Sequence, residues 1–175
     1  MNMEELRSLQ APLKERYREC PEAALMTLRA EGRIGEGITC AVGTGKALVE
    51  AGLHPATGGT GLMACSGNML LEALAACAGV TLGAVATAIG IEIRDGMVRA
   101  EGDLDFRGTL GVSKETPVGF QCIRLQFDLA TDATEDQLAT LLRLTERYCV
   151  VYQTLRQSPE ISVSHRVTKS GSASG

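Results

Sequence analysis

A long apolar run limits the possible folds of this chain more than any other feature. From Ala73 to Ile91, 19 residues carry no charge, which is enough to cross a bilayer as a helix. The run is rich in Ala, Gly and Thr, however, and Glu72 and Glu92 stand at its two ends. Neither a second span nor an aromatic belt accompanies it. We therefore expect a helix buried on all sides within a soluble protein, and no membrane partner.

The residues around this run indicate where the helix begins and ends. Ser66 or Asn68 can cap its N-terminus after a Gly-rich segment. Gly90 is expected to end the helix after about Ile89, because glycine readily adopts the left-handed conformation of helix C-termini. Cys77 then lies in the first half of the helix.

A second helix is predicted in the C-terminal third. Thr134 followed by Gln137 forms a capping box, and Ser158-Pro159 ends the helix after about Leu155. Its apolar stripe consists of Leu138, Leu141, Leu142, Thr145 and Cys149. Cys149 is therefore expected inside this helix, on the side that faces the core.

The remaining segments have strand character and are separated by turns. They comprise residues 24–31, 37–42, 46–51, 91–108, 121–131 and 160–167. Apolar and polar residues alternate from Ile123 to Leu129, as in a sheet with one covered face. Asp95-Gly96 and residues 108–119 are expected to form turns. Strands and helices in this order predict an α+β fold, with helices packed on an antiparallel sheet.

The two ends of the chain are expected to lie outside this domain. Residues 1–21 have the composition of a helical extension, interrupted by Pro12, and residues 169–175 that of a disordered tail. The domain itself would comprise residues 22–168. Because the N-terminus lacks the basic and apolar regions of a signal peptide, we expect a cytoplasmic protein.

Charge and composition exclude several classes of function. A net charge of -4 and a pI near 5.3 argue against a nucleic-acid partner. The aromatic share of 3% means that small side chains form the core, which favours an interface between subunits. The six cysteines have neither the spacing of a zinc site nor that of a disulfide framework in the reducing cytosol.

Cys77 and Cys149 are the cysteines that two packed helices could bring together. Packed helix axes lie roughly 8–10 Å apart, which is compatible with contact between two thiols. A reactive thiol also needs a lowered pKa, commonly through a nearby cation. Tyr148 and Tyr152 flank Cys149 and could line a pocket for an apolar substrate, although packing in the core is the simpler interpretation.

Three segments resemble the OsmC/Ohr family of osmotically induced and organic-hydroperoxide-resistance proteins. They are residues 70–82, with Ala-Ala-Cys inside the long helix, residues 102–127, and residues 144–155 around the second cysteine. The resemblance implies antiparallel sheets wrapped around two long buried helices in an intertwined homodimer, with active sites at the subunit interface.

The same resemblance implies a peroxidase that acts on organic hydroperoxides, including those of fatty acids. Cys77 would be oxidised to a sulfenic acid and Cys149 would condense with it to a disulfide. An external dithiol, a lipoylated protein in many relatives, would reduce the disulfide. The cycle requires no metal and no cofactor.

The match to the family's other site positions is incomplete. Arg33 best fits the arginine that holds the thiolate, but Gly67 occupies the position of the acid that orients it. Glu72 could replace that acid, although a capping or solvated role is the simpler interpretation. Many members have Pro where this chain has Val150. These departures leave an alternative open, namely an OsmC-fold redox sensor or a dimer that binds a small apolar ligand without efficient turnover.

Overall fold

The computed structural model describes residues 2–5, 7–8, 10–11, 19, 32–34, 39–43, 48–111 and 113–167. Residues 3–5, 7–8 and 10–11 are helical, as expected for the N-terminal extension. The strand expected over residues 24–31 and the disordered tail expected over residues 169–175 lie outside the described residues.

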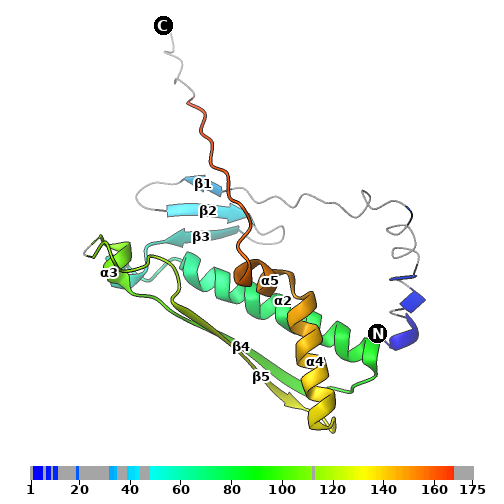
Figure 1. Ribbon diagram of the computed structural model, residues 1–175. Coiled ribbons are helices and arrows are strands. Elements are labelled where there is room, and N and C mark those ends of the chain that lie inside the picture. The colour runs from blue at the N-terminus through cyan, green and yellow to red at the C-terminus, as the bar shows by residue number, and fades with distance from the viewer. Residues whose placement is uncertain are drawn as a thin grey trace, which may run out of the picture.

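Three short strands near the N-terminus form an antiparallel sheet in the order β1-β2-β3 (Figure 1), of which the second and third match the strands predicted over residues 37–42 and 46–51. They are β1 (Gly32–Ile34), β2 (Thr39–Gly43) and β3 (Leu48–Gly52). A short 3-10 helix, η2 (Pro55–Thr57), follows β3. Ala64 then bonds back to β3 through Glu50 and Gly52, which attaches this sheet to the start of the long helix.

The long helix α2 (Ser66–Ile89) is the central element of the fold (Figure 1). It ends where the sequence predicts, since Gly90 is left-handed with φ 76°. Its N-cap is Cys65, which makes no side-chain capping bond, so the prediction of a Ser66 or Asn68 cap was wrong. By length and composition alone α2 could cross a membrane. It packs instead against other helices and a sheet.

Burial of α2 is confined to one stripe, contrary to the expectation of burial on all sides. The buried residues recur every four positions and are Leu74, Ala78, Leu82 and Ala86. On another face, Val80 is 76% exposed. One chain therefore supplies enough partners for one side of this helix, and its remaining apolar surface stays uncovered.

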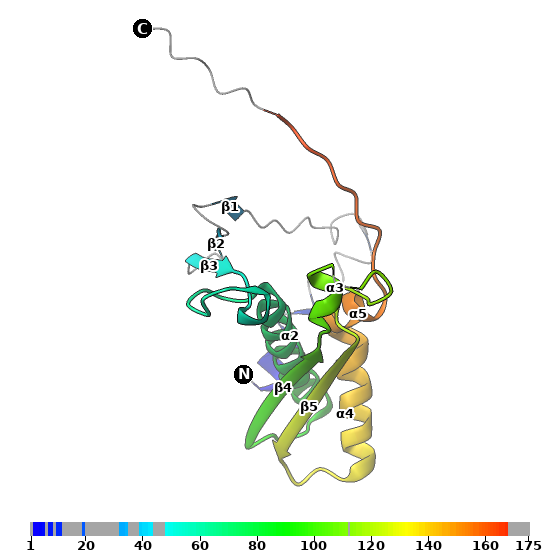
Figure 2. The same cartoon turned by 90° about the vertical axis from the view of Figure 1, so that its left-hand side faces the viewer.

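Strands β4 (Asp95–Asp103) and β5 (Cys122–Ala130) form a second antiparallel sheet, and Figure 2 shows α2 and α4 beside it. Residues on β5 alternate between exposed and half-buried, as predicted from Ile123 to Leu129. Asp95 and Gly96 open β4 and pair with Ala130 and Leu129, so the turn predicted there is wrong. A short helix, α3 (Phe106–Thr109), lies in the connection between the strands.

Helix α4 (Glu135–Tyr148) begins with the predicted capping box. The Gln137 N–H donates to the Thr134 hydroxyl over 3.3 Å, and the Thr134 N–H donates to the Gln137 side chain over 2.8 Å. Leu141 of α4 packs with Leu82 and Ala86 of α2 in the core. The apolar stripe thus docks α4 on α2.

The second predicted helix is divided in two at Cys149. Cys149 ends α4 and precedes α5 (Val150–Arg156), with φ -72° and ψ 109°. The extended backbone at this single residue turns the chain, so the prediction of one continuous helix to Leu155 was wrong. Cys149 consequently lies at a helix break instead of within a helix.

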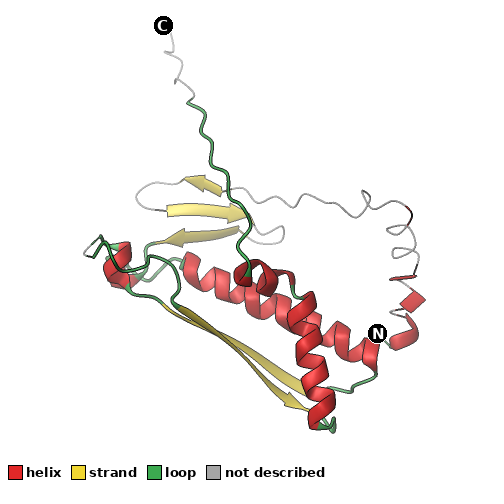
Figure 3. Ribbon diagram, viewed as in Figure 1, coloured by secondary structure: helices red, strands yellow, loops and turns green. Residues whose placement is uncertain are grey.

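The chain leaves the body of the protein after α5 (Figure 3). Residues 158–167 are described as extended backbone without strand pairing, so the strand predicted over residues 160–167 is not formed. Ile161, Val163 and Val167 keep their alternating spacing but are exposed. Alternation along a segment predicts which face would be covered, but it does not specify a strand edge with which the segment pairs.

Candidate functional site

The structure brings Cys77 and Cys149 together. Cys77 lies halfway along α2 and is partly buried, whereas Cys149, at the break between α4 and α5, is only 1% exposed. Both are free thiols, and the Cys149 thiol hydrogen-bonds to the Cys77 sulfur. The two cysteines chosen from the sequence are therefore direct neighbours.

The break at Cys149 supplies two further hydrogen bonds to Cys77. In a continuous helix the N–H groups of Val150 and Val151 would bond to carbonyls four residues earlier. Here both N–H groups donate to the Cys77 sulfur. Interrupting the helix thus provides backbone donors for a thiolate.

These donors determine the direction of the pKa shift at Cys77. Burial alone would raise the pKa of the thiol. Opposing it are hydrogen bonds, from the largest effect to the smallest, from the Val151 N–H, the Cys149 thiol, the Val150 N–H and the Thr81 hydroxyl. Together they lower the pKa of Cys77, which makes it the better nucleophile of the pair.

The pKa of Cys149 is shifted in the opposite direction. Burial raises its pKa, and a charged Cys77 beside it raises it further, while N–H bonds from Tyr152 and Val151 only partly compensate. The pair therefore favours a thiolate at Cys77 next to a protonated thiol at Cys149. A nucleophile and a second thiol in contact with it are the two groups that a disulfide-forming cycle needs.

The predicted arginine lies on an early strand, as it does in the family that the sequence resembles. Arg33 lies in β1 opposite Ala41, and its side chain lies outside the described residues. Four arginines of the described ranges form ion pairs on the surface, namely Arg94 with Asp132, Arg99 with Asp128, Arg107 with Asp105, and Arg124 with Asp103. The assignment of Arg33 remains a prediction.

Glu72 and Gly67, the two positions considered for an acid that orients the arginine, both lie on α2 before Cys77. Glu72 is exposed on α2, five residues before Cys77. Gly67 lies ten residues before Cys77 on α2, which corresponds to about 15 Å along the axis. A Cβ at position 67 would face Phe120 at 3.5 Å and Cys65 at 3.6 Å. The donors to the Cys77 thiol within the described residues are the N–H groups of Val150 and Val151, the Cys149 thiol and the Thr81 hydroxyl.

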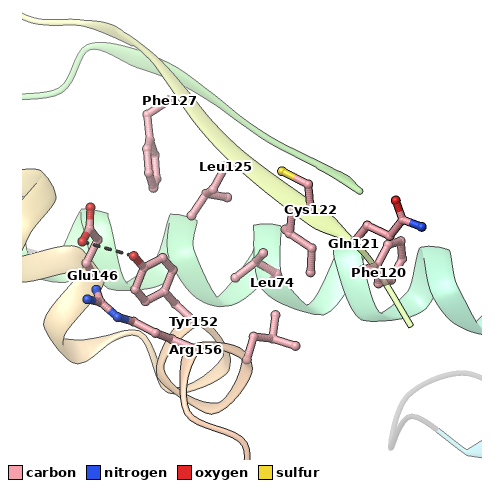
Figure 4. Close-up of a pocket in the computed structure, with 11 residues that line it drawn as sticks. Leu74, Phe120, Gln121, Cys122, Leu125, Phe127, Glu146, Tyr152 and Arg156 are labelled. Atoms are coloured by element: carbon pink, nitrogen blue, oxygen red, sulfur yellow. Dashed lines mark hydrogen bonds between the residues drawn. The ribbon is translucent and has the colours of Figure 1, made fainter. Parts of the chain in front are cut away.

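A cavity of about 470 Å³ lies between α2, β5 and the helix break (Figure 4). Its apolar lining includes Leu74, Phe120, Ile123, Leu125, Phe127 and Leu155. Tyr152 lines it too, and its hydroxyl donates to the Glu146 carboxylate over 3.2 Å. Tyr148 lines a separate cavity along α2. Both tyrosines thus line cavities, although different ones, where the sequence favoured packing in the core.

Three contributors to this site were not identified from the sequence. Thr81 follows Cys77 by four residues on α2, a spacing that places them on one helix face and could have indicated the contact. The N–H groups of Val150 and Val151 gave no such signal, because their side chains are ordinary helix residues. The described residues contain no cluster of metal-ligating side chains.

Comparisons with known proteins agree with the fold and with the sequence resemblance. The family model described as OsmC-like protein matches residues 59–164. An OsmC-like protein from Mycoplasma pneumoniae has 17% identity and a TM-score of 0.63, covering 76% of this chain and 89% of that one. No match was found among curated proteins.

Two structurally similar proteins are described as organic hydroperoxide resistance proteins. The one from Elizabethkingia anophelis has 17% identity and a TM-score of 0.62, covering 77% of this chain and 91% of that one. OhrB of Bacillus subtilis has 22% identity and a TM-score of 0.52, covering 77% and 94%. At these identities the structural likeness establishes the fold.

Proposed function

This chain belongs to the OsmC-like protein family, and on that premise we propose that it is a cysteine-based peroxidase for organic hydroperoxides, including those of fatty acids. The observation that carries the proposal is the contact between Cys77 and Cys149, with opposite pKa shifts. Organic hydroperoxide resistance proteins share this fold. The cavity between α2, β5 and the helix break supplies an apolar surface for an organic substrate, and its lining residue Tyr152 is linked to the pair through its N–H bond to Cys149.

The proposed reaction begins with attack by the Cys77 thiolate on the distal oxygen of the hydroperoxide. The O–O bond breaks, the alcohol leaves after gaining a proton, and Cys77 becomes a sulfenic acid. Cys149 then attacks the Cys77 sulfur, and water leaves as the disulfide forms. An external dithiol, a lipoylated protein being our candidate, returns both cysteines to thiols by exchange. We place the reaction in the cytoplasm, with Arg33 assisting the thiolate.

Mass spectrometry after one equivalent of cumene hydroperoxide tests this proposal. We expect a disulfide between Cys77 and Cys149 within seconds, because the second thiol is already in contact with the first. The free thiol Cys65 should remain reduced and serves as an internal control. Persistence of both Cys77 and Cys149 as thiols would contradict the proposal.

The cavity also favours a second candidate function, in which the protein binds a small apolar ligand or senses oxidants without efficient turnover. Its apolar lining and its size fit a ligand site. The same experiment separates the candidates: a co-purified lipid together with unmodified thiols supports binding, and rapid formation of the disulfide supports catalysis.

The uncovered surface of α2 leads us to propose the intertwined homodimer, with active sites at the interface. A second cavity of about 470 Å³ runs along α2 and is lined by Val80, Thr81, Ala84, Val85, Ala88 and Tyr148, together with Gln10. Since Thr81 also contacts Cys77, a second copy on this face would adjoin the site.

Sedimentation equilibrium tests the proposed dimer. Each chain has a mass of 18.5 kDa, and we expect the mass of two chains. Replacing the exposed Val80 by Asp should weaken the association, because a charge would have to be desolvated at the interface. The matched control is Val118→Asp, at an exposed position of the loop between α3 and β5. The mass of a single chain at micromolar concentration would contradict the proposal.

A further inference from the structure

The break at Cys149 leaves a backbone carbonyl without its usual helical partner. In a continuous helix the Glu146 carbonyl would accept from the N–H of Val150. That N–H donates to Cys77 instead. The Glu146 carbonyl accepts a hydrogen bond of 2.7 Å from the side-chain amide of Gln153. A side chain of α5 thus replaces the backbone donor that α4 has lost.

A second side-chain bond crosses the break beside the first. The Tyr152 hydroxyl donates to the Glu146 carboxylate, as Figure 4 shows. The backbone on both sides is fixed as well, because the Cys149 N–H bonds to Thr145 over 2.9 Å and the Gln153 N–H bonds to Cys149 over 3.0 Å. Glu146 and Gln153 therefore connect the last turn of α4 with α5.

A connection of this kind is needed because the residues at the break have no intrinsic reason to interrupt a helix. Neither glycine nor proline occurs between Thr145 and Leu155, and breaks are usually found at those residues. If the Gln153 amide is removed, the Glu146 carbonyl needs a new donor, and the Val150 N–H is the nearest helical candidate. That exchange would take a hydrogen bond away from Cys77.

We propose that Gln153 is a positioning residue for the two-cysteine site: by bonding to the Glu146 carbonyl it maintains the helix break, which keeps the N–H groups of Val150 and Val151 directed at Cys77. This inference deepens the proposed function, on which its catalytic meaning rests. Gln153, a side chain outside the cysteine pair, would thereby preserve the hydrogen bonds that stabilise the Cys77 thiolate.

The test is the rate at which Cys77 is alkylated by iodoacetamide, followed by peptide mass spectrometry from about pH 5 to pH 10. No hydroperoxide is present, so the result does not depend on peroxidase activity. Gln153→Met keeps the length of the side chain and loses the donor. We expect alkylation of Cys77 at neutral pH to slow roughly fivefold, with the profile moved to higher pH. Cys149 is the titratable group that faces Cys77 among the described residues.

Gln157→Met is the matched control, because Gln157 is exposed at the end of α5. It should leave the profile of Cys77 unchanged. A Gln153→Met protein that is alkylated like the parent at every pH would overturn the proposal.

Val150→Pro provides a second and independent test. Proline is well tolerated at the first position of a helix and has no N–H to offer to Glu146, so it enforces the break without Gln153. It also removes the Val150 N–H bond to Cys77, so the Val150→Pro protein itself is the reference for this comparison. In this background, adding Gln153→Met should have little further effect on the alkylation of Cys77. An equal slowing in both backgrounds would overturn the proposal. If the profiles shift as expected but hydroperoxide produces no disulfide, the positioning role holds and the peroxidase function fails.

Discussion

Replacing Cys77 by Ser should reduce hydroperoxide consumption, measured with an excess of dithiol, to the uncatalysed background. The reason is chemical, since a serine hydroxyl stays protonated at neutral pH where the lowered pKa of Cys77 favours a thiolate. The expected loss is on the order of a thousandfold or more, because the nucleophile itself is removed. The assay follows the disappearance of cumene hydroperoxide under conditions in which the parent protein turns over repeatedly.

Cys65→Ser is the matched control for this variant. Cys65 is the N-cap of the same helix and makes no side-chain capping bond, and serine is a favourable residue at that position. Its activity should therefore equal that of the parent. If Cys77→Ser consumed hydroperoxide as fast as Cys65→Ser, the assignment of Cys77 would be wrong.

The sequence predicted those parts of the fold that short-range patterns determine. Gly90 ends α2 and the capping box of Thr134 and Gln137 begins α4, because both signals act within one helical turn. The alternation from Ile123 to Leu129 likewise identified β5 and its covered face. The packing of α4 on α2 then brought Cys77 and Cys149 together, an encounter that the sequence could only suggest.

The helix break at Cys149 could not be predicted because its causes are tertiary. Val150 and Val151 would continue a helix, but their N–H groups find an acceptor in Cys77, 72 residues away from Cys149 in the sequence. The Gln153 amide replaces them at the Glu146 carbonyl. A pattern read along one segment contains neither the distant acceptor nor the replacement donor.

The strand predicted over residues 160–167 is not formed, because an alternating pattern does not specify a pairing partner. Ile161 and Val163 alternate with polar residues as in a strand, but alternation states only which face would be covered, not which strand edge is available. The burial of α2 was overestimated in the same way, since Val80 remains exposed. In both cases the sequence identifies apolar residues but does not specify what covers them.

Replacing Cys149 by Ser should separate the first chemical step from the rest of the cycle. Cys77 keeps the N–H bonds from Val150 and Val151, and serine retains a hydroxyl donor next to the sulfur. One equivalent of hydroperoxide per chain should therefore still be consumed. Without a resolving thiol the sulfenic acid cannot form the internal disulfide and proceeds to the sulfinic acid with further hydroperoxide.

The mass of the Cys77 peptide distinguishes these states. In Cys149→Ser we expect the addition of one oxygen, trapped by dimedone, followed by the addition of two oxygens as hydroperoxide increases. Turnover with a lipoylated protein as reductant should cease, because that step is proposed to require the disulfide. Cys65→Ser is the control, since Cys65 is a free thiol at the N-cap of α2 and should leave the disulfide intact. Sustained turnover of Cys149→Ser with the protein dithiol would mean that the sulfenic acid is reduced directly, and Cys149 would lose its proposed role as the resolving cysteine.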